Sequence, residues 1–506
     1  MPKKSTSNKL KAAPSKKAKS LSINGAIGGY EAINHDNSRR RSPPRWTAAE
    51  EWHLNSTQRI AMSANARDLA RNMPLVVSAM KKHVSFITDL NFHACTADRG
   101  FNRALEQWWI EECRPERFDA ASRHSWQRSL RLTEACRLLD GDVGWLKIGN
   151  GARRGCVQVI EGDRIGTPTM MLPDDFDPQF WSNGVQIDTA TGRALNYAIC
   201  NRMGGTGKVL DRVVPARNLM LHAHYGFRFD QVRGVSVIAA AMNQFRDCAE
   251  TIDYAYAKVK LSQIMGWIVT RDDDGTGPVF GAGTVDYQQD TDADGENDAA
   301  PVIDPKMSAP FVTELNKGED IKLLESGTPS TETMAFIRFT VQLALSTLGI
   351  PYCMWDENFG SYAGQKAAIS QYLYTCRDHI ADLRWLAMQH ARWAMGLAII
   401  DNELILPSGK DFDFVDNSFE FVSGEFPWSD QVKDARSTAM EIAMGLTNPY
   451  RAAQERGTRA EDNADKTQQF IEYCESIGLP VTYTDSTLFA PNVVSDGNAN
   501  DSTKPY

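Results

Sequence analysis

The 506-residue sequence predicts an α+β fold divided into several domains. The first observation is that apolar residues recur at steps of three and four along many stretches, which is typical of amphipathic helices. The second is a group of short strand-like runs separated by Gly, Asn and Asp turns. The third is the length, which suffices for a large core and about two to four domains.

Charge is distributed unevenly along the chain. Residues 1–45 carry seven Lys and four Arg against Glu31 and Asp36, whereas the whole chain has a net charge of −9. The segment is too polar to bury a core, so we expect a disordered basic arm. It serves either as a flexible arm or as a contact for nucleic acid or a scaffold partner. The remaining body is strongly acidic, which disfavours tight phosphate binding.

Residues 46–233 predict a mixed helical and strand region. Helices are expected over 47–90, 101–113 and 121–140. The apolar face of the first stretch consists of Leu69, Met73, Val76, Met80 and Val84. Strands are expected in four runs that begin at Trp145, Val157, Val185 and Asn218.

A long helix is predicted from Gly234 to about Met265, with Ser236 as its N-cap. Its seam repeats every 3.5 residues, a period that favours a nearly parallel helical neighbour. A second periodic helix is expected over 330–348. The two helices either pair with each other or pack against copies of themselves. The seam consists of Ile238, Ala241, Phe245, Cys248, Ile252, Ala255 and Val259.

The segment between the two periodic helices has a different character. Short strands are expected at Trp267 and Ile321, and residues 272–304 hold ten acids and no basic residue. We expect a small exposed subdomain with an acidic loop over 266–329. Further on, strands are predicted at 404–406, 412–414 and 419–422, helices at 429–447 and 459–477, and a flexible tail at 481–506.

A loop over 349–364 separates two helices. Gly349 and the Ile350-Pro351 pair end the second helix, since Pro disfavours helical geometry in the residue before it. A third periodic helix is expected over 365–395. A loop of fixed length with aromatic and acidic residues between two helices is a candidate contact site. Its candidate residues are Trp355, Asp356, Glu357, Asn358, Phe359, Gly360, Ser361, Tyr362 and Lys366.

Several enzyme signatures are incomplete. Gly204–Lys208 resembles a phosphate loop, but Val209 stands where magnesium needs Ser or Thr, so a hairpin turn is favoured. Ile238 occupies the second glycine position of a nucleophile elbow. Pro301 replaces the twelfth-position Glu of a calcium loop. His222 and His224 lack a third ligand at a recognisable spacing.

We therefore expect no catalytic residue, no metal site and no cofactor, and the chain is predicted not to be an enzyme. No apolar run reaches the roughly 18–20 residues that span a bilayer, so no membrane partner is expected.

An ordered series of segments resembles the bacteriophage portal proteins of the lambda type. The resemblance covers about residues 46–475. One departure is Tyr362-Ala-Gly-Gln-Lys366, where the family often has Tyr-Ser-Ser-x-Arg, and another is Asp430-Gln431, where it often has Asp-Pro. The matching segments are Asn65–Asn72, Asp140–Val143, Val159–Ile165, His224, Gln231–Ser236, Leu348–Tyr352, Asn358–Lys366, Phe426–Asp430 and Gly445-Leu446.

The resemblance implies a portal-type multidomain fold in a ring of about twelve subunits. The parts that it implies are a wing (46–233 and 396–427), two stem helices (234–265 and 330–348), a clip (266–329), a tunnel loop (349–364), a joining helix (365–395) and a helical crown (428–480).

The implied function is that of a head-tail connector at one capsid vertex, through which the genome is packaged and later ejected. The implied partners are further copies of the chain, double-stranded DNA held without sequence specificity, the large terminase subunit, head-completion or adaptor proteins, and the major capsid and scaffold proteins. Assembly would take place in the host cytoplasm and the product would reside in the virion. Two alternatives are a nucleic-acid-processing phage enzyme with an unrecognised active site and a non-viral scaffold.

Overall fold

The structure is a computed structural model. It describes residues 49–169, 180–203, 207–226, 228–264, 267–271, 319–323, 331–356, 362–423 and 431–479. The predicted basic arm, the acidic stretch 272–304 and the tail 481–506 lie outside the described residues.

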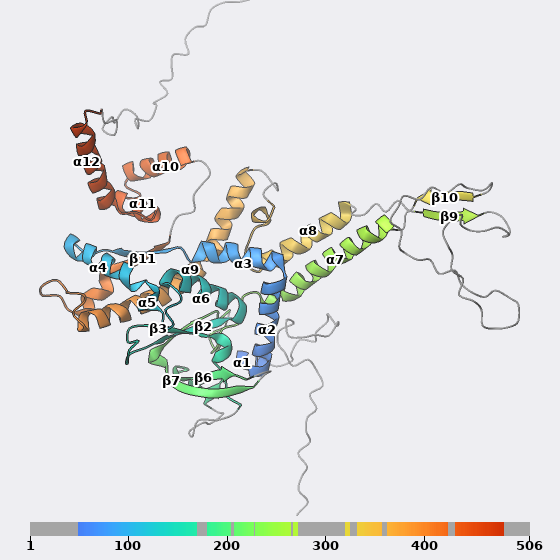
Figure 1. The fold of residues 1–506 in the computed structure, drawn as a ribbon, viewed down its shortest axis with the longest axis horizontal. Coiled ribbons are helices and arrows are strands. Elements are labelled where there is room, and N and C mark those ends of the chain that lie inside the picture. The colour runs from blue at the N-terminus through green and yellow to red at the C-terminus, as the bar shows by residue number, and fades with distance from the viewer. Residues whose placement is uncertain are drawn as a thin grey trace, which may run out of the picture. The chain divides into compact units, whose positions relative to one another are not determined.

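The described chain is a mixture of helices and strands, as the sequence predicts (Figure 1). The helices are α1 (Glu50–His53), α2 (Ser56–Asn72), α3 (Pro74–Ile87), α4 (Arg99–Glu112), α5 (Pro115–Phe118), α6 (Trp126–Asp140), α7 (Met242–Ile264), α8 (Thr331–Ser346), α9 (Tyr362–Ile400), α10 (Gln431–Ala443), α11 (Pro449–Glu455) and α12 (Ala460–Ser476). The strands are β1 (Leu90–Ala94), β2 (Asp142–Lys147), β3 (Val157–Glu161), β4 (Trp181–Ser182), β5 (Val185–Ile187), β6 (Ala194–Arg202), β7 (Lys208–Pro215), β8 (Leu219–Ala223), β9 (Trp267–Arg271), β10 (Glu319–Leu323) and β11 (Phe419–Ser423).

Two antiparallel sheets share one apolar core. One sheet has the order β3-β2-β8 and the other has the order β4-β5-β6-β7. A β-bridge between Ile165 and Ile199 links the segment after β3 to strand β6. The core residues come from both sheets, so the two sheets stabilise each other by burying a common surface. These core residues are Leu146, Ile160, Ile165, Val185, Tyr197, Ile199, Val214 and Leu219.

Helix boundaries follow local chemistry. The side chain of Asn55 caps α2 and forms a capping box with Gln58. Pro74 opens α3, where the missing amide hydrogen has no intrahelical role. Gly141 ends α6 in the left-handed region, at φ 91°. Such signals are local, which is why the predicted helices over 47–90 and 121–140 are largely confirmed.

Four predictions near the connections need correction. The long helix α7 begins at Met242 rather than Gly234, after a 3₁₀ turn at Ala239–Ala241. Ser236 does not cap it, because its buried hydroxyl donates to the Leu138 carbonyl at 2.8 Å. Residues 404–406 form no strand, and 412–414 belong to a 3₁₀ helix, Phe412–Asn417. The Asp, Asn and Ser side chains in and next to this 3₁₀ helix compete for backbone hydrogen bonds, and such residues favour turns over strands.

The chain divides into two compact units. One comprises Met1–Asn243 and Ala344–Tyr506, and the other comprises Gln244–Leu343. In the second unit, β9 and β10 pair antiparallel, which confirms the two short strands expected there. Among the helices that the structure describes, none has both the length and the apolar character needed to cross a bilayer.

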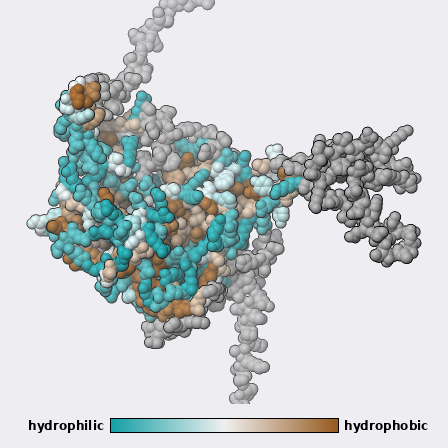
Figure 2. All heavy atoms as spheres, in the orientation of Figure 1, coloured by the Kyte–Doolittle hydropathy of each residue, from teal (hydrophilic) through white to brown (hydrophobic). Residues whose placement is uncertain are grey.

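The coloured part of the face seen in Figure 2 is mostly polar, with local exceptions. Figure 2 shows apolar atoms gathered at the C-terminal end of α12, where Ile477 and Leu479 are about half exposed.

Candidate functional site

The first end of the predicted contact loop is closely packed. Leu348 and Ile350 are buried, and Gly349 adopts φ +66°, where an added Cβ would lie 2.7 Å from Thr375 Oγ1 of α9. A 3₁₀ turn, Tyr352–Met354, then leads to the exposed Trp355. The loop therefore leaves the body through a tightly packed base.

The remaining predicted loop residues are only partly covered by the structure. Asp356 donates its amide hydrogen to the Tyr352 carbonyl at 3.0 Å. Tyr362 begins α9, and Lys366 is exposed on the first turns of that helix. Glu357, Asn358, Phe359, Gly360 and Ser361 lie outside the described residues. The structure thus describes the residues at the start of the loop and those that follow it on α9. The contact of the loop with DNA stays a prediction.

The predicted seam falls into two halves with different burial. The first four residues are at most 1 % exposed, although the first two precede α7. The last three, all within α7, are only half-buried. The seam is therefore an internal packing face at one end and a partly uncovered face at the other. The buried half is Ile238, Ala241, Phe245 and Cys248, and the half-buried part is Ile252, Ala255 and Val259.

Sequence reasoning missed a buried charged junction. Arg233 is 1 % exposed and donates five hydrogen bonds, as many as a guanidinium can make. Two reach the Asp142 carboxylate at 2.6 and 2.7 Å. The others reach the carbonyls of Ile165 (2.6 Å), Asn183 (2.8 Å) and Gly162 (2.7 Å). We call this set the Arg233 junction; it closes the segment before α7 onto both sheets.

Backbone groups complete the Arg233 junction. Glu51 of α1 accepts hydrogen bonds from the amides of Val232 (2.7 Å) and Arg233 (3.2 Å). Arg59 of α2 donates to the Gly234 carbonyl. A Cβ on Gly234 would lie 2.0 Å from the Gly141 carbonyl oxygen, a distance that no side chain permits. Glycine is therefore required where these two main chains meet.

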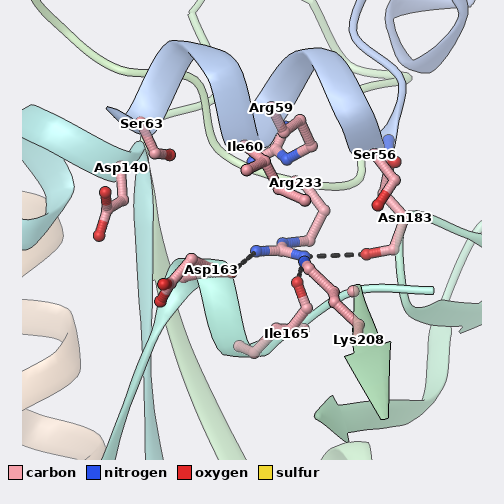
Figure 3. Close-up of a pocket in the computed structure, with 12 residues that line it drawn as sticks. Ser56, Arg59, Ile60, Ser63, Asp140, Asp163, Ile165, Asn183, Lys208 and Arg233 are labelled. Atoms are coloured by element: carbon pink, nitrogen blue, oxygen red, sulfur yellow. Dashed lines mark hydrogen bonds between the residues drawn. The ribbon is translucent and has the colours of Figure 1, made fainter. Parts of the chain in front are cut away.

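Figure 3 shows residues that line a small cavity beside Arg233, among them Lys208 and Asn183. It encloses about 10 Å³, about the space of a single water molecule. Burial lowers the pKa of Lys208 to about 8. A cavity of this size has no room for a nucleotide or a substrate, so the Arg233 junction is a structural element.

A neighbouring acidic cluster is neutralised by arginines. Asp140, Glu161 and Asp163 have carboxylate oxygens close enough to share a metal ion. Arg67 instead binds Asp140 at 2.5 Å, Glu161 at 3.2 Å and Asp163 at 3.3 Å. Arg202 adds a contact to Asp163 at 2.7 Å. Burial raises the pKa of Asp140 to about 6 despite the Arg67 contact.

A second polar cluster joins α3, α6 and α9. His83 and Tyr372 share a hydrogen bond of 2.9 Å between Nδ1 and the hydroxyl. Glu134 accepts two hydrogen bonds from Arg137, at 2.9 and 2.6 Å, and Arg137 also contacts His379. His83, Glu134 and His379 could geometrically hold a metal ion. Because the Arg137 guanidinium already supplies the positive charge there, we assign no metal to them.

The histidines of this second cluster are held neutral. Burial lowers the pKa of His83 and of His224 to about 4. Burial and the nearby Arg137 lower the pKa of His379 to about 3. For Glu134, burial opposes ionisation, but Arg137 and His222 outweigh it and lower its pKa well below the usual range. The cluster therefore holds a buried Glu134–Arg137 ion pair beside the neutral rings of His83, His224 and His379.

One sequence signal could have located the Arg233 junction. Asp140–Val143, Val159–Ile165 and Gln231–Ser236 were singled out as separate segments, and the structure brings all three together at Arg233. The partner could not be named from sequence, because Asp142 lies 91 residues away.

Comparison with known proteins identifies a family for most of the chain. The model described as "Phage portal protein, lambda family" matches residues 36–378. Among curated proteins, none matches the sequence.

Solved structures give remote likenesses. One, described as the neck of an empty GTA particle computed with C6 symmetry, is 13 % identical, with a TM-score of 0.46, covering 83 % of this chain and 94 % of that chain. Another, a virion of a native gene transfer agent particle, is 12 % identical, with a TM-score of 0.45 and coverages of 85 % and 100 %. An HK97-family phage portal protein from Corynebacterium diphtheriae is 12 % identical, with a TM-score of 0.30 and coverages of 60 % and 83 %.

Proposed function

The chain belongs to the lambda family of phage portal proteins, and from this premise we propose that its copies close into a ring around a DNA channel. The ring stands at one vertex of the capsid as the head-tail connector. Double-stranded DNA passes through it during packaging and again during ejection. The protein itself catalyses no reaction, and the large terminase subunit supplies the ATP-driven force.

The observation that carries the ring is an exposed apolar face on α8. Phe336, Phe339 and Leu343 recur at steps of three and four, and their exposed fractions are 56 %, 60 % and 48 %. We call these three residues the α8 stripe. The opposite side of the helix already packs inside, with Val341 and Ala344 at most 5 % exposed. A helix that is apolar on both sides is normally buried all round, so a second copy is the expected cover.

Charge fits the passage of DNA. The whole chain carries a net charge of −9, and residues 1–45 alone hold eleven basic residues against two acids. The rest of the chain is thus strongly acidic. Tight phosphate contacts would slow a sliding duplex, because each contact adds salt-dependent affinity. An acidic channel wall repels the phosphates, and the loop then supplies weak contacts that ignore sequence.

The proposed division of the chain follows the ranges that the resemblance implies. In that division 46–233 and 396–427 form the wing, 234–265 and 330–348 the stem, 266–329 the clip, 349–364 the tunnel loop and 428–480 the crown. The clip would meet the terminase motor first and the head-completion or adaptor proteins later. Major capsid and scaffold proteins would surround the ring.

The ring is tested with a double variant, Phe336→Asp with Phe339→Asp. Two carboxylates in a buried subunit contact would be left without partners, so we expect folded single chains in place of rings. Negative-stain imaging and analytical ultracentrifugation measure the outcome. The control is Ile110→Asp on α4, a residue that is 63 % exposed and should leave rings intact. Normal rings from the double variant would contradict the proposed interface.

The tunnel loop is tested by deleting 355–362. We expect rings of wild-type appearance that retain less DNase-protected DNA per particle. Wild-type DNA content in the deletion variant would remove the proposed role of the loop while leaving the ring proposal standing.

A further inference from the structure

One face of α3 contacts the first part of the tunnel loop and also the helix α9 that follows the loop. Lys82 donates from Nζ to the carbonyl of Met354, the last residue of the 3₁₀ turn in the first part of the loop. His83 binds the Tyr372 hydroxyl at 2.9 Å, on the helix that follows the loop. Phe86 packs edge-on against the same Tyr372 ring, with centroids 5.2 Å apart. Lys82 and Phe86 lie one turn apart on α3, His83 follows Lys82 directly, and the three residues contact Met354 in the loop and Tyr372 on α9.

The Lys82 contact has a clear physical role. A short 3₁₀ turn leaves its last carbonyls without partners inside the turn, and a side-chain cation near that end stabilises it. Trp355 and Asp356 both donate their amide hydrogens to Tyr352, at 2.8 and 3.0 Å. The ammonium group on Met354 therefore holds the turn whose hydrogen bonds orient the first loop residues. On α9, Tyr372 is held separately by its hydrogen bond with the buried His83.

We propose that Lys82 is a positioning residue that fixes the direction in which the tunnel loop leaves the body, so that α3 sets the approach of the loop to DNA. The proposal rests on the tunnel-loop role given above. Lys82 need not touch DNA, because its effect passes through the Met354 carbonyl. The neighbouring Lys81 is exposed on the same helix and has the same charge, which makes it a matched control.

The experiment compares Lys82→Met, Lys82→Arg, Lys81→Met and the 355–362 deletion. Each is purified as an assembled ring, and amide hydrogen exchange is followed by mass spectrometry. In Lys82→Met, the amides of Trp355 and Asp356 should exchange roughly tenfold faster or more, because the turn has lost a charged hydrogen bond. Exchange in α3 and in the second half of α9 should stay as in wild type. Lys82→Arg keeps the cation and should restore slow exchange.

Particles assembled with each variant are then assayed for DNase-protected DNA. Lys82→Met should package several-fold less than wild type, whereas Lys82→Arg and Lys81→Met should package normally. Wild-type exchange at Trp355 and Asp356 in Lys82→Met would overturn the proposal, as would faster exchange throughout α3 and α9. If the deletion packages normally, the tunnel-loop role fails, and the exchange data still decide whether Lys82 positions the loop.

Discussion

The Arg233 junction and the α8 stripe distribute polarity in opposite ways. At the Arg233 junction, a charged side chain lies inside the protein, and each of its five N–H groups has an acceptor. Along the α8 stripe, apolar side chains lie at the surface, and Phe339 is 60 % exposed. Within one chain, a buried charge is acceptable where its partners are complete, and the exposed apolar side chains of the α8 stripe are those that the proposed ring would cover.

Removing the arginine should produce the largest effect. In Arg233→Ala, Asp142 stays buried and loses its bidentate partner, which should lower the free energy of unfolding by about 3–5 kcal/mol. The urea midpoint of the disassembled chain measures the change. Arg228→Ala removes an exposed arginine paired with Asp230 at 2.6 Å and should change the free energy by less than about 0.5 kcal/mol. Equal shifts in the two variants would show that burial does not distinguish them.

A single methyl group should be nearly as damaging at the Arg233 junction. Gly234→Ala would place Cβ 2.0 Å from the Gly141 carbonyl oxygen, and neither backbone can move without separating α6 from the α7 connection. We expect a loss of about 2–3 kcal/mol, measured as above. Gly149→Ala is the control, since nothing lies within 4 Å of its added Cβ. Tolerance of Gly234→Ala would contradict the close approach.

Acid should weaken the buried cluster on α3 and α9. Burial lowers the pKa of His83 to about 4 from an ordinary 6.5, so the unfolded chain binds the proton first. Stability from this residue is complete above pH 6.5 and falls as the pH drops towards 4. Between pH 7.5 and 5.0, His83 should account for about 1–2 kcal/mol of lost stability.

Thermal unfolding at the two pH values measures this loss. A His83→Gln variant should show a smaller difference between pH 7.5 and 5.0 than wild type does. Lys81→Gln changes an exposed residue two positions before His83 on the same helix, and this variant should keep the full difference in stability between the two pH values. An unchanged difference in His83→Gln would remove this histidine from the pH response.

The smallest effect on stability is expected from a substitution in the α8 stripe. In the disassembled chain, Phe339→Asp should shift the urea midpoint by less than the equivalent of about 0.5 kcal/mol, because the side chain is already 60 % exposed. A large loss would mean that the α8 stripe packs within its own chain and does not await a second copy.

The sequence predicted what depends on neighbouring residues. Gly141 and Gly349 end helices through backbone preferences that act locally, and α6 and α8 end at Asp140 and Ser346, close to the predicted ends at 140 and 348. The predicted start of α7 was wrong because the Ser236 hydroxyl donates to the Leu138 carbonyl and does not cap the helix. Leu138 lies 98 residues earlier in the chain, and no local pattern reveals a contact of that range.

The candidate site divides in the same way. The loop between α8 and α9 was located from helix periodicity, but its support by Lys82 was not, because Met354 lies 272 residues further along. The seam was read as one continuous face. Burial ends after Cys248, and periodicity alone cannot tell a covered face from an uncovered one.

The long sequence separations at the Arg233 junction bear on the order of events in the cell. Arg59 and Gly234 are 175 residues apart, and contacts of such range form slowly because a large loop must close first. The second part of the first unit, Ala344–Tyr506, also follows the α8 stripe in the chain, so a newly synthesised chain would expose the α8 stripe while its first unit is still incomplete. Productive assembly then requires subunits to mature faster than they meet, so slow synthesis or chaperone protection should raise the yield of closed particles over aggregates.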